Sequence, residues 1–241
     1  MKISSNSVVL FTGDSITEGA RIRRMDLNHI FGHGYQYTIA SLLALENCEN
    51  MPKFINKAYS GYTIDKLYDT WEEDVIKNKP TVVSILVGTN DAAQGYFSSL
   101  TPEETAAKYE EYFEKAISDA LSALPNTKFI ICEPFYFPLE RNGSYDKTPH
   151  PYVESHFNRP DSGDTDELVE FKLKAIDLIR AKARDIAKRH SFTFVPLYDE
   201  FVKNIEKSQP EYFTWDGTHP TIAGHALIAR QWLKYTEDMT V

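Results

Sequence analysis

Short apolar runs rich in β-branched residues alternate along this chain with longer segments of helical periodicity. Such alternation predicts βαβ units and a parallel sheet, because two parallel strands need a crossover connection that is usually a helix. The runs TVVSILVG and KFIIC are almost continuously apolar, as expected for strands that helices cover on both faces. We predict strands at residues 8–12, 53–57, 81–87, 128–132 and 192–196.

Three helices carry clear sequence signals. The first begins at Thr101, with Pro102 at its first position and Glu104 completing a capping box. A second is predicted from about 165 to 190, and a third after Pro220. Residues at three-four spacing are expected to face the core. In the three helices in turn they are Tyr109, Phe113, Ala116, Ile117, Ala120, Leu121 and Leu124; Leu168, Phe171, Ala175, Leu178, Ile179 and Ile186; and Ile222, Ala226, Ala229 and Leu233.

The chain is predicted to form one domain over residues 1–241. Its 241 residues are 42% hydrophobic, and it contains no internal repeat and no Gly/Ser linker. Residues 133–164 are rich in proline and aromatic residues and lack a steady period, so we expect a long irregular insertion there. An insertion of this length is typical of a lid or a binding loop.

The net charge restricts the partners that the protein is expected to bind, and the N-terminal segment restricts its expected location. A net charge of -9 and a pI near 5.3 argue against nucleic acid and against anionic membrane surfaces. The N-terminal segment is too polar for a secretory signal, and no run reaches the length of a membrane span. We therefore expect a cytoplasmic protein. Cys48 and Cys132 are expected to be two reduced, buried thiols.

Small polar residues and glycines follow the predicted strands. Gly13, Asp14 and Ser15 follow the first strand, Gly61 follows the second, and Asn90 follows the third. Open parallel sheets bind ligands beyond the carboxyl ends of their strands. In a sheet of order 2-1-3-4-5, the first strand lies between the second and the third. Ser15, Gly61 and Asn90 are then expected to converge on one crevice.

A second group of polar residues, Asp216 and His219, lies near the C-terminus. A serine nucleophile needs an imidazole base and a carboxylate that orients the base. His219 would serve as that base and Asp216 as its partner if their loop returns to the crevice. The N–H groups of Ser15 and Gly61 and the amide of Asn90 are candidate oxyanion donors.

Each of these residues also has a purely structural explanation. Asp14 and Ser15 would cap a helix, and Gly61 would serve a turn. Asn90 is a common turn or cap residue after a strand, and His219 beside a proline would be a surface loop residue. No third ligand accompanies the remaining histidine pairs, so we expect no metal site.

Four motifs, FTGDSIT, NKAYSGYT, LVGTND and WDGTHP, occur in the order and approximate spacing of the four sequence blocks of the SGNH (GDSL-type) hydrolase superfamily. The chain resembles this superfamily over most of its length. The resemblance implies a flavodoxin-like three-layer α/β/α sandwich with a five-stranded parallel sheet, and ester hydrolysis without a cofactor. It also implies Ser15 as nucleophile, His219 as base, Asp216 as its partner, and an oxyanion hole of Ser15, Gly61 and Asn90.

The segment from NKAYSGYT to LVGTND further resembles intracellular acetyl esterases that act on xylan-derived oligosaccharides. The leading hypothesis is therefore a serine esterase that removes short acyl groups, above all acetyl, from a carbohydrate. The alternatives are a lysophospholipase or thioesterase, and a non-catalytic carbohydrate-binding protein. Asp14, Tyr62 and Trp215 are candidates to line the substrate pocket. The expected partner is a small-molecule ester, and aromatic residues in the loops add self-association as a hypothesis.

Overall fold

The computed structural model describes residues 1–22, 26–139 and 164–241. Within these ranges, a five-stranded parallel sheet has the order β2-β1-β3-β4-β5. The predicted fold class and strand order are confirmed, and each predicted strand end lies within one residue of the observed one. The strands are β1 (Val8–Gly13), β2 (Lys53–Asn56), β3 (Val82–Leu86), β4 (Lys128–Cys132) and β5 (Thr193–Val195).

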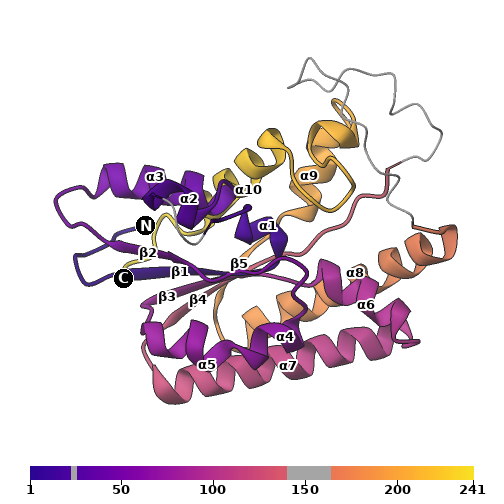
Figure 1. The fold of residues 1–241 in the computed structure, drawn as a ribbon, viewed down its shortest axis with the longest axis horizontal. Helices are drawn as coiled ribbons and strands as arrows, with labels where there is room; N and C mark the ends of the chain where they lie inside the picture. The colour runs from indigo at the N-terminus through magenta and orange to yellow at the C-terminus, as the bar shows by residue number, and fades with distance from the viewer. Residues whose placement is uncertain (23–25, 140–163) are drawn as a thin grey trace.

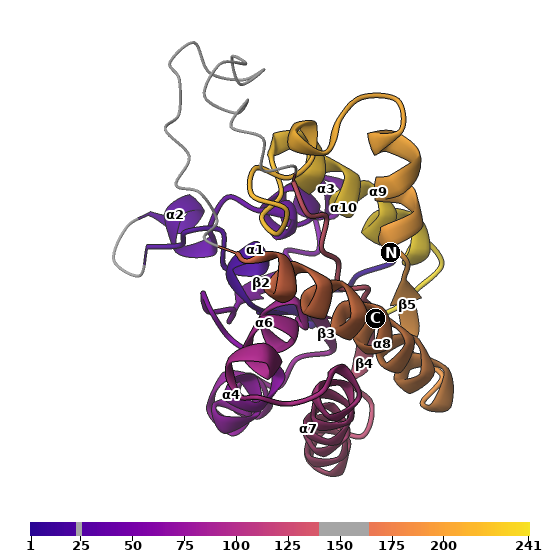
Figure 2. The same ribbon diagram turned by 90° about the vertical axis from the view of Figure 1, so that its right-hand side faces the viewer.

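Helices cover both faces of the sheet and so form three layers (Figure 1, Figure 2). On one face lie α3 (Tyr35–Glu46), α9 (Tyr198–Ile205) and α10 (Ile222–Tyr235). The other face carries α4 (Ile64–Asp69), α5 (Trp71–Asp74), α6 (Thr89–Phe97), α7 (Pro102–Ala123) and α8 (Asp166–Arg189). The remaining helical segments are α1 (Ser15–Glu18), α2 (Leu27–Phe31), η1 (Ile76–Asn78) and η3 (Pro210–Tyr212).

Successive residues of β1 belong to two different hydrophobic cores, one on each face of the sheet. Phe11 of β1 is fully buried and packs with Tyr35 of α3 and Trp232 of α10. Its neighbour Leu10 belongs to the opposite core, together with residues of α4, α5, α7 and α8. Because both faces of the sheet are covered, β3 and β4 are almost continuously apolar, as the sequence pattern predicted.

Helices α7, α8 and α10 form where predicted, and in α7 the expected inward residues are buried except Leu121 and Leu124, which are half-buried. Thr101 and Glu104 form the predicted capping box at the start of α7. In α10 Ala229 is buried as predicted and Leu233 is half-buried, but Ile222 and Ala226 are exposed. The buried face also holds Leu227, Ile228 and Trp232. The indole N–H of Trp232 donates to Ser84 Oγ of β3 at 3.0 Å, which fixes the rotation of α10 on the sheet.

Two other expectations need correction. In α8, Phe171 and Leu178 are only half-buried and lie at the edge of the buried face. Cys132 is buried, but Cys48 is exposed, because α3 ends at Glu46 and Cys48 lies in the turn beyond it.

Residues 140–163 of the predicted insertion lie outside the described ranges. In those ranges, no helix is both long and apolar enough to cross a lipid bilayer.

Candidate active site

The segment that carries Ser15 turns sharply where β1 ends. Gly13 has a φ of +142°, and a Cβ there would lie 2.0 Å from the carbonyl oxygen of Leu86, so only glycine fits. Asp14 caps α1 by accepting a hydrogen bond from the N–H of Ile16 at 3.0 Å. Ser15 is the first residue of α1, so its N–H has no intrahelical acceptor. Its side chain lies half-buried at the carboxyl end of the sheet.

The loop before α10 returns to this point and completes a chain of hydrogen bonds. His219 Nε2 lies 2.7 Å from Ser15 Oγ, and His219 Nδ1 lies 2.6 Å from Asp216 Oδ2. The other carboxylate oxygen of Asp216 accepts the backbone N–H groups of Thr218 and His219 at 2.9 and 2.7 Å. The carboxylate therefore holds both the imidazole and the backbone of its own loop. The structure brings the side chains of Ser15, His219 and Asp216 together in one hydrogen-bonded chain.

The electrostatics of this loop favour an ion pair between Asp216 and His219. Burial by itself lowers the pKa of the His219 imidazole, but the hydrogen bond and charge of Asp216 outweigh burial and raise that pKa above its ordinary 6.5. The buried charge of Asp14 acts in the same direction. Burial also opposes ionisation of Asp216, yet its bonds from His219 and Thr218 lower the pKa of this carboxyl. The ring nitrogen that faces Ser15 is thus made more basic.

Gly61 lies in a tight turn after β2, which the N–H of Tyr62 closes by donating to Tyr59 O at 3.2 Å. Gly61 has a φ of +75°, which favours glycine at this position of the turn. A Cβ on Gly61 would meet no atom within 4 Å. Glycine is therefore required by the backbone conformation, not by crowding from the protein itself. Among the described residues, the Gly61 N–H has no hydrogen-bond acceptor.

Asn90 joins this turn to the segment after β3. It is the second residue of α6, and one of its amide hydrogens is donated to the carbonyl oxygen of Tyr62 at 3.0 Å. The side-chain amide carries a second hydrogen, which leaves a donor for a substrate oxygen. Since β1 pairs with both β2 and β3, the segments that carry Ser15, Gly61 and Asn90 leave the same edge of the sheet.

The three pocket candidates have different surroundings. Asp14 is 1% exposed, and its bonds to the backbone of α1 make it a helix cap, so we do not place it against substrate. Burial raises the pKa of its carboxyl to about 6. Tyr62 is half-buried and stacks on Tyr59. Trp215 is 40% exposed and stacks on the imidazole of His219, which leaves it available to a ligand beside the nucleophile.

Sequence reasoning missed a buried lysine close to this site. Lys172 of α8 is 7% exposed and donates to Asp164 Oδ2 at 2.9 Å, and its ammonium lies 3.8 Å from the ring centre of Tyr136. Its charge reaches His219 and acts to lower the imidazole pKa. The sequence does contain a signal for this lysine, because helical spacing places Lys172 on the same buried face of α8 as Leu168 and Ala175. A charged residue on an apolar face indicates a buried partner.

Comparison with known proteins agrees with this geometry. The GDSL-like Lipase/Acylhydrolase family matches residues 11–227, and the chain belongs to this family. It is accordingly an ester hydrolase of the GDSL type.

Individual relatives are similar over nearly the whole chain. An acetylxylan esterase from Geobacillus stearothermophilus is 30% identical over 237 residues, which are 97% of this chain and 95% of that protein. A crystal structure of an acetylxylan esterase from the same organism superposes with a TM-score of 0.75 and 27% identity, covering 98% and 96% of the two chains. A putative GDSL-like lipase from Parabacteroides merdae gives a TM-score of 0.77 and 28% identity, with 98% of each chain covered.

Proposed function

We propose that this esterase removes short acyl groups, above all acetyl, from a carbohydrate such as an acetylated xylo-oligosaccharide. The observation that carries the proposal is the continuous hydrogen-bonded chain from Ser15 through His219 to Asp216. A serine hydroxyl is a weak nucleophile unless a base accepts its proton, and this chain supplies the base and the group that orients it. Ser15 is the proposed nucleophile, His219 the base and Asp216 the orienting carboxylate.

The proposed reaction runs in two half-reactions on these side chains. Ser15 Oγ attacks the ester carbonyl carbon while His219 Nε2 takes the hydroxyl proton. The imidazolium then gives this proton to the departing sugar oxygen, and the acyl group remains on Ser15. A water next gives its proton to His219 Nε2 and attacks the acyl carbon. The same proton returns to Ser15 Oγ as acetic acid leaves, and the acid then loses its own proton to solvent.

The proposed oxyanion hole consists of the N–H groups of Ser15 and Gly61 and the free amide hydrogen of Asn90. Both backbone N–H groups lack an acceptor among the described residues, and all three donors lie on segments that leave one edge of the sheet. Donors fixed before the reaction stabilise the negative charge that develops on the carbonyl oxygen. No step of this scheme calls for a metal or a cofactor.

The acetylated-sugar substrate has two supports. The Geobacillus stearothermophilus relative, 30% identical over nearly the full length of both chains, is an acetylxylan esterase. Trp215 presents an exposed indole next to His219, and an aromatic face of this kind suits stacking against a pyranose ring.

The central test is a Ser15→Ala variant assayed for acetate release from an aryl acetate. We expect turnover to fall to the level of the uncatalysed reaction, with an unchanged circular-dichroism spectrum. Ser41→Ala, which removes an exposed hydroxyl on α3, is the matched control and should retain full activity. Persistent turnover by Ser15→Ala would contradict the nucleophile assignment. Failure of a fluorophosphonate probe to label the wild type would favour a non-catalytic binding protein.

A substrate panel tests the chemical class. We expect acetate release from acetylated xylo-oligosaccharides, measured beside acetylated manno- and chito-oligosaccharides. Aryl acetate should also be hydrolysed faster than aryl octanoate. The reverse order would favour a lysophospholipase or thioesterase, because such enzymes bind a long acyl chain.

A further inference from the structure

The two proposed backbone donors belong to separate segments, so their spacing depends on contacts that join those segments. Ser15 lies on α1, whereas Gly61 lies in residues 57–62, which we call the oxyanion turn. Continued pairing with β1 anchors only the start of this turn. The N–H of Lys57 donates to Phe11 O at 2.8 Å, and the N–H of Tyr59 donates to Gly13 O at 3.1 Å. The far end of the turn is held by the Asn90 amide, which donates to Tyr62 O at 3.0 Å, so the segment between these anchors depends on further contacts.

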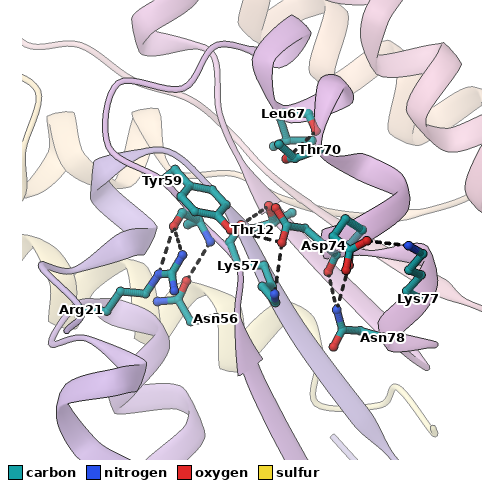
Figure 3. A network of polar contacts seen from close by, with 12 residues as sticks. Thr12, Arg21, Asn56, Lys57, Tyr59, Leu67, Thr70, Asp74, Lys77 and Asn78 are labelled. Carbon is teal, nitrogen blue, oxygen red and sulfur yellow. Dashed lines mark hydrogen bonds and ion pairs between the residues drawn. The ribbon is translucent and has the colours of Figure 1, made fainter. Parts of the chain in front are cut away.

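Arg21, which follows α1, makes such a contact with the oxyanion turn. Its Nε and Nη2 donate to the carbonyl oxygen of Ala58 at 3.1 and 2.9 Å. Its guanidinium carbon also lies 4.8 Å from the ring centre of Tyr59 (Figure 3). Two donors from one planar group converge on one oxygen, so the contact is directional as well as attractive. It ties the segment of the nucleophile to the segment of the second donor.

Tyr59 connects the oxyanion turn to α5, in the helix layer that contains α4 to α8. Its hydroxyl donates to Asp74 Oδ1 at 3.1 Å, and Lys57 Nζ donates to the same oxygen at 3.1 Å (Figure 3). Asp74 is the last residue of α5 and is 5% exposed. The ring of Tyr59 stacks on Tyr62 with 4.8 Å between ring centres. Arg21 therefore holds the oxyanion turn at the carbonyl oxygen of Ala58, and Asp74 holds it at the side chain of Tyr59.

We propose that Arg21 and Tyr59 are positioning residues that aim the Gly61 N–H at the developing oxyanion. The proposal rests on the proposed function, because this aim matters only during acyl transfer. Neither residue needs to touch the substrate. The N–H of Gly61 stabilises the tetrahedral state only at hydrogen-bond distance, and a displacement of about 1 Å can cost a large share of the rate. Loosening the turn is therefore expected to slow chemistry more than it weakens substrate binding.

The test compares Arg21→Met, Arg21→Lys and Tyr59→Phe with a control, Lys77→Ala. Lys77 belongs to the same polar network but forms an exposed pair with Glu73, away from the oxyanion turn (Figure 3). For aryl acetate, we expect Arg21→Met to lower kcat by about tenfold with KM changed less than about twofold. Arg21→Lys should restore part of the lost kcat. Tyr59→Phe should lower kcat less than Arg21→Met does, because it keeps the aromatic ring. Lys77→Ala should match the wild type.

A second readout separates positioning from general destabilisation. Methylboronic acid forms a tetrahedral adduct on an active serine, so its binding should weaken in parallel with kcat across the variants. Acetate, a planar product, should bind all variants alike. Unchanged kcat in Arg21→Met, or a kcat that falls only in proportion to the folded fraction, would overturn the positioning role. An inactive wild type would overturn the proposed function and this proposal with it.

Discussion

The indole of Trp215 lies face to face with the imidazole of His219, with 5.2 Å between ring centres and 17° between ring planes. The two residues are also joined through the backbone, because the N–H of Trp215 donates to His219 O at 3.0 Å. The indole thus covers one face of the proposed base, whose Nδ1 bonds to Asp216 Oδ2, and the indole residue itself remains 40% exposed. A residue placed in this way is positioned to affect both the imidazole and the sugar of the proposed substrate.

We expect Trp215→Ala to lower kcat/KM for acetylated xylo-oligosaccharides by roughly tenfold, about 1.4 kcal/mol of transition-state stabilisation. Both the restraint on His219 and the surface for stacking are lost. Trp215→Phe should retain most of the activity, because a smaller aromatic face remains. The informative comparison is with aryl acetate, for which the loss should be smaller. Equal losses on the two substrates would contradict a sugar-stacking role.

The raised pKa of His219 predicts the acidic limb of the pH–rate profile. The proposed mechanism needs a neutral imidazole, so kcat/KM should fall as pH drops through the His219 pKa, which lies above 6.5. Asp216→Asn removes the charge that raises this pKa, and the limb of its residual activity should move to lower pH. Its kcat should fall by about 10³–10⁴, because the orientation and tautomer of the imidazole are no longer held. A limb that stays in place would show that Asp216 does not set the pKa of the base.

The contact between Trp232 and Ser84 predicts a stability effect without a loss of activity. Both residues are fully buried, and the indole N–H donates to Ser84 Oγ at 3.0 Å. Ser84→Ala leaves that N–H without its acceptor, so we expect the free energy of unfolding to fall by about 1–3 kcal/mol. Chemical denaturation measures the change, with the exposed Ser41→Ala as control. A loss no larger than that of the control would show that this hydrogen bond contributes little.

The sheet could be predicted closely from the sequence because its signals are local. Buried parallel strands are continuous apolar runs, and the positions of Ser15, Gly61 and Asn90 follow from the strand ends once the strand order is assumed. The phase of α10 could not be predicted in this way. Apolar residues occur on all sides of this helix, so its periodicity does not identify the buried side. The hydrogen bond from Trp232 to Ser84 of β3 determines which side faces the sheet.

The contacts around the oxyanion turn were also out of reach of sequence patterns. Arg21, Tyr59 and Asp74 come from three segments, and no periodicity relates them. The sequence predicts a turn at Gly61, but only the structure shows that its positive φ requires glycine while the protein leaves open space on its Cβ side. From the sequence Asp14 is either a pocket residue or a helix cap, and the structure shows its carboxylate accepting the N–H of Ile16 at the start of α1.

Asp91, next to Asn90, gives the stability of this protein a pH dependence of unusual sign for a carboxyl. One oxygen accepts the N–H of Ile64 at 3.0 Å, and the other is buried without a partner among the described residues. Burial, with the nearby charges of Asp65 and Asp14, raises its pKa from 3.8 to about 7. Between these two values the folded chain holds a proton at Asp91 that the unfolded chain has lost. The free energy of unfolding therefore falls as pH rises through this window.

Asp91→Asn keeps the oxygen that accepts the Ile64 N–H and removes the ionisation. We expect its unfolding free energy, relative to the wild type, to rise by on the order of 3 kcal/mol between pH 5 and pH 8, because pH 5 lies two units below a pKa of about 7 and each unit contributes about 1.4 kcal/mol. Any cost of burying the extra amide hydrogens is the same at both pH values, so it cancels in this difference. Urea denaturation at the two pH values measures it, with the exposed Asp69→Asn as control. A relative stability that does not change with pH would mean that Asp91 is ionised in the folded protein at pH 5, and that its burial is compensated in a way its contacts do not reveal.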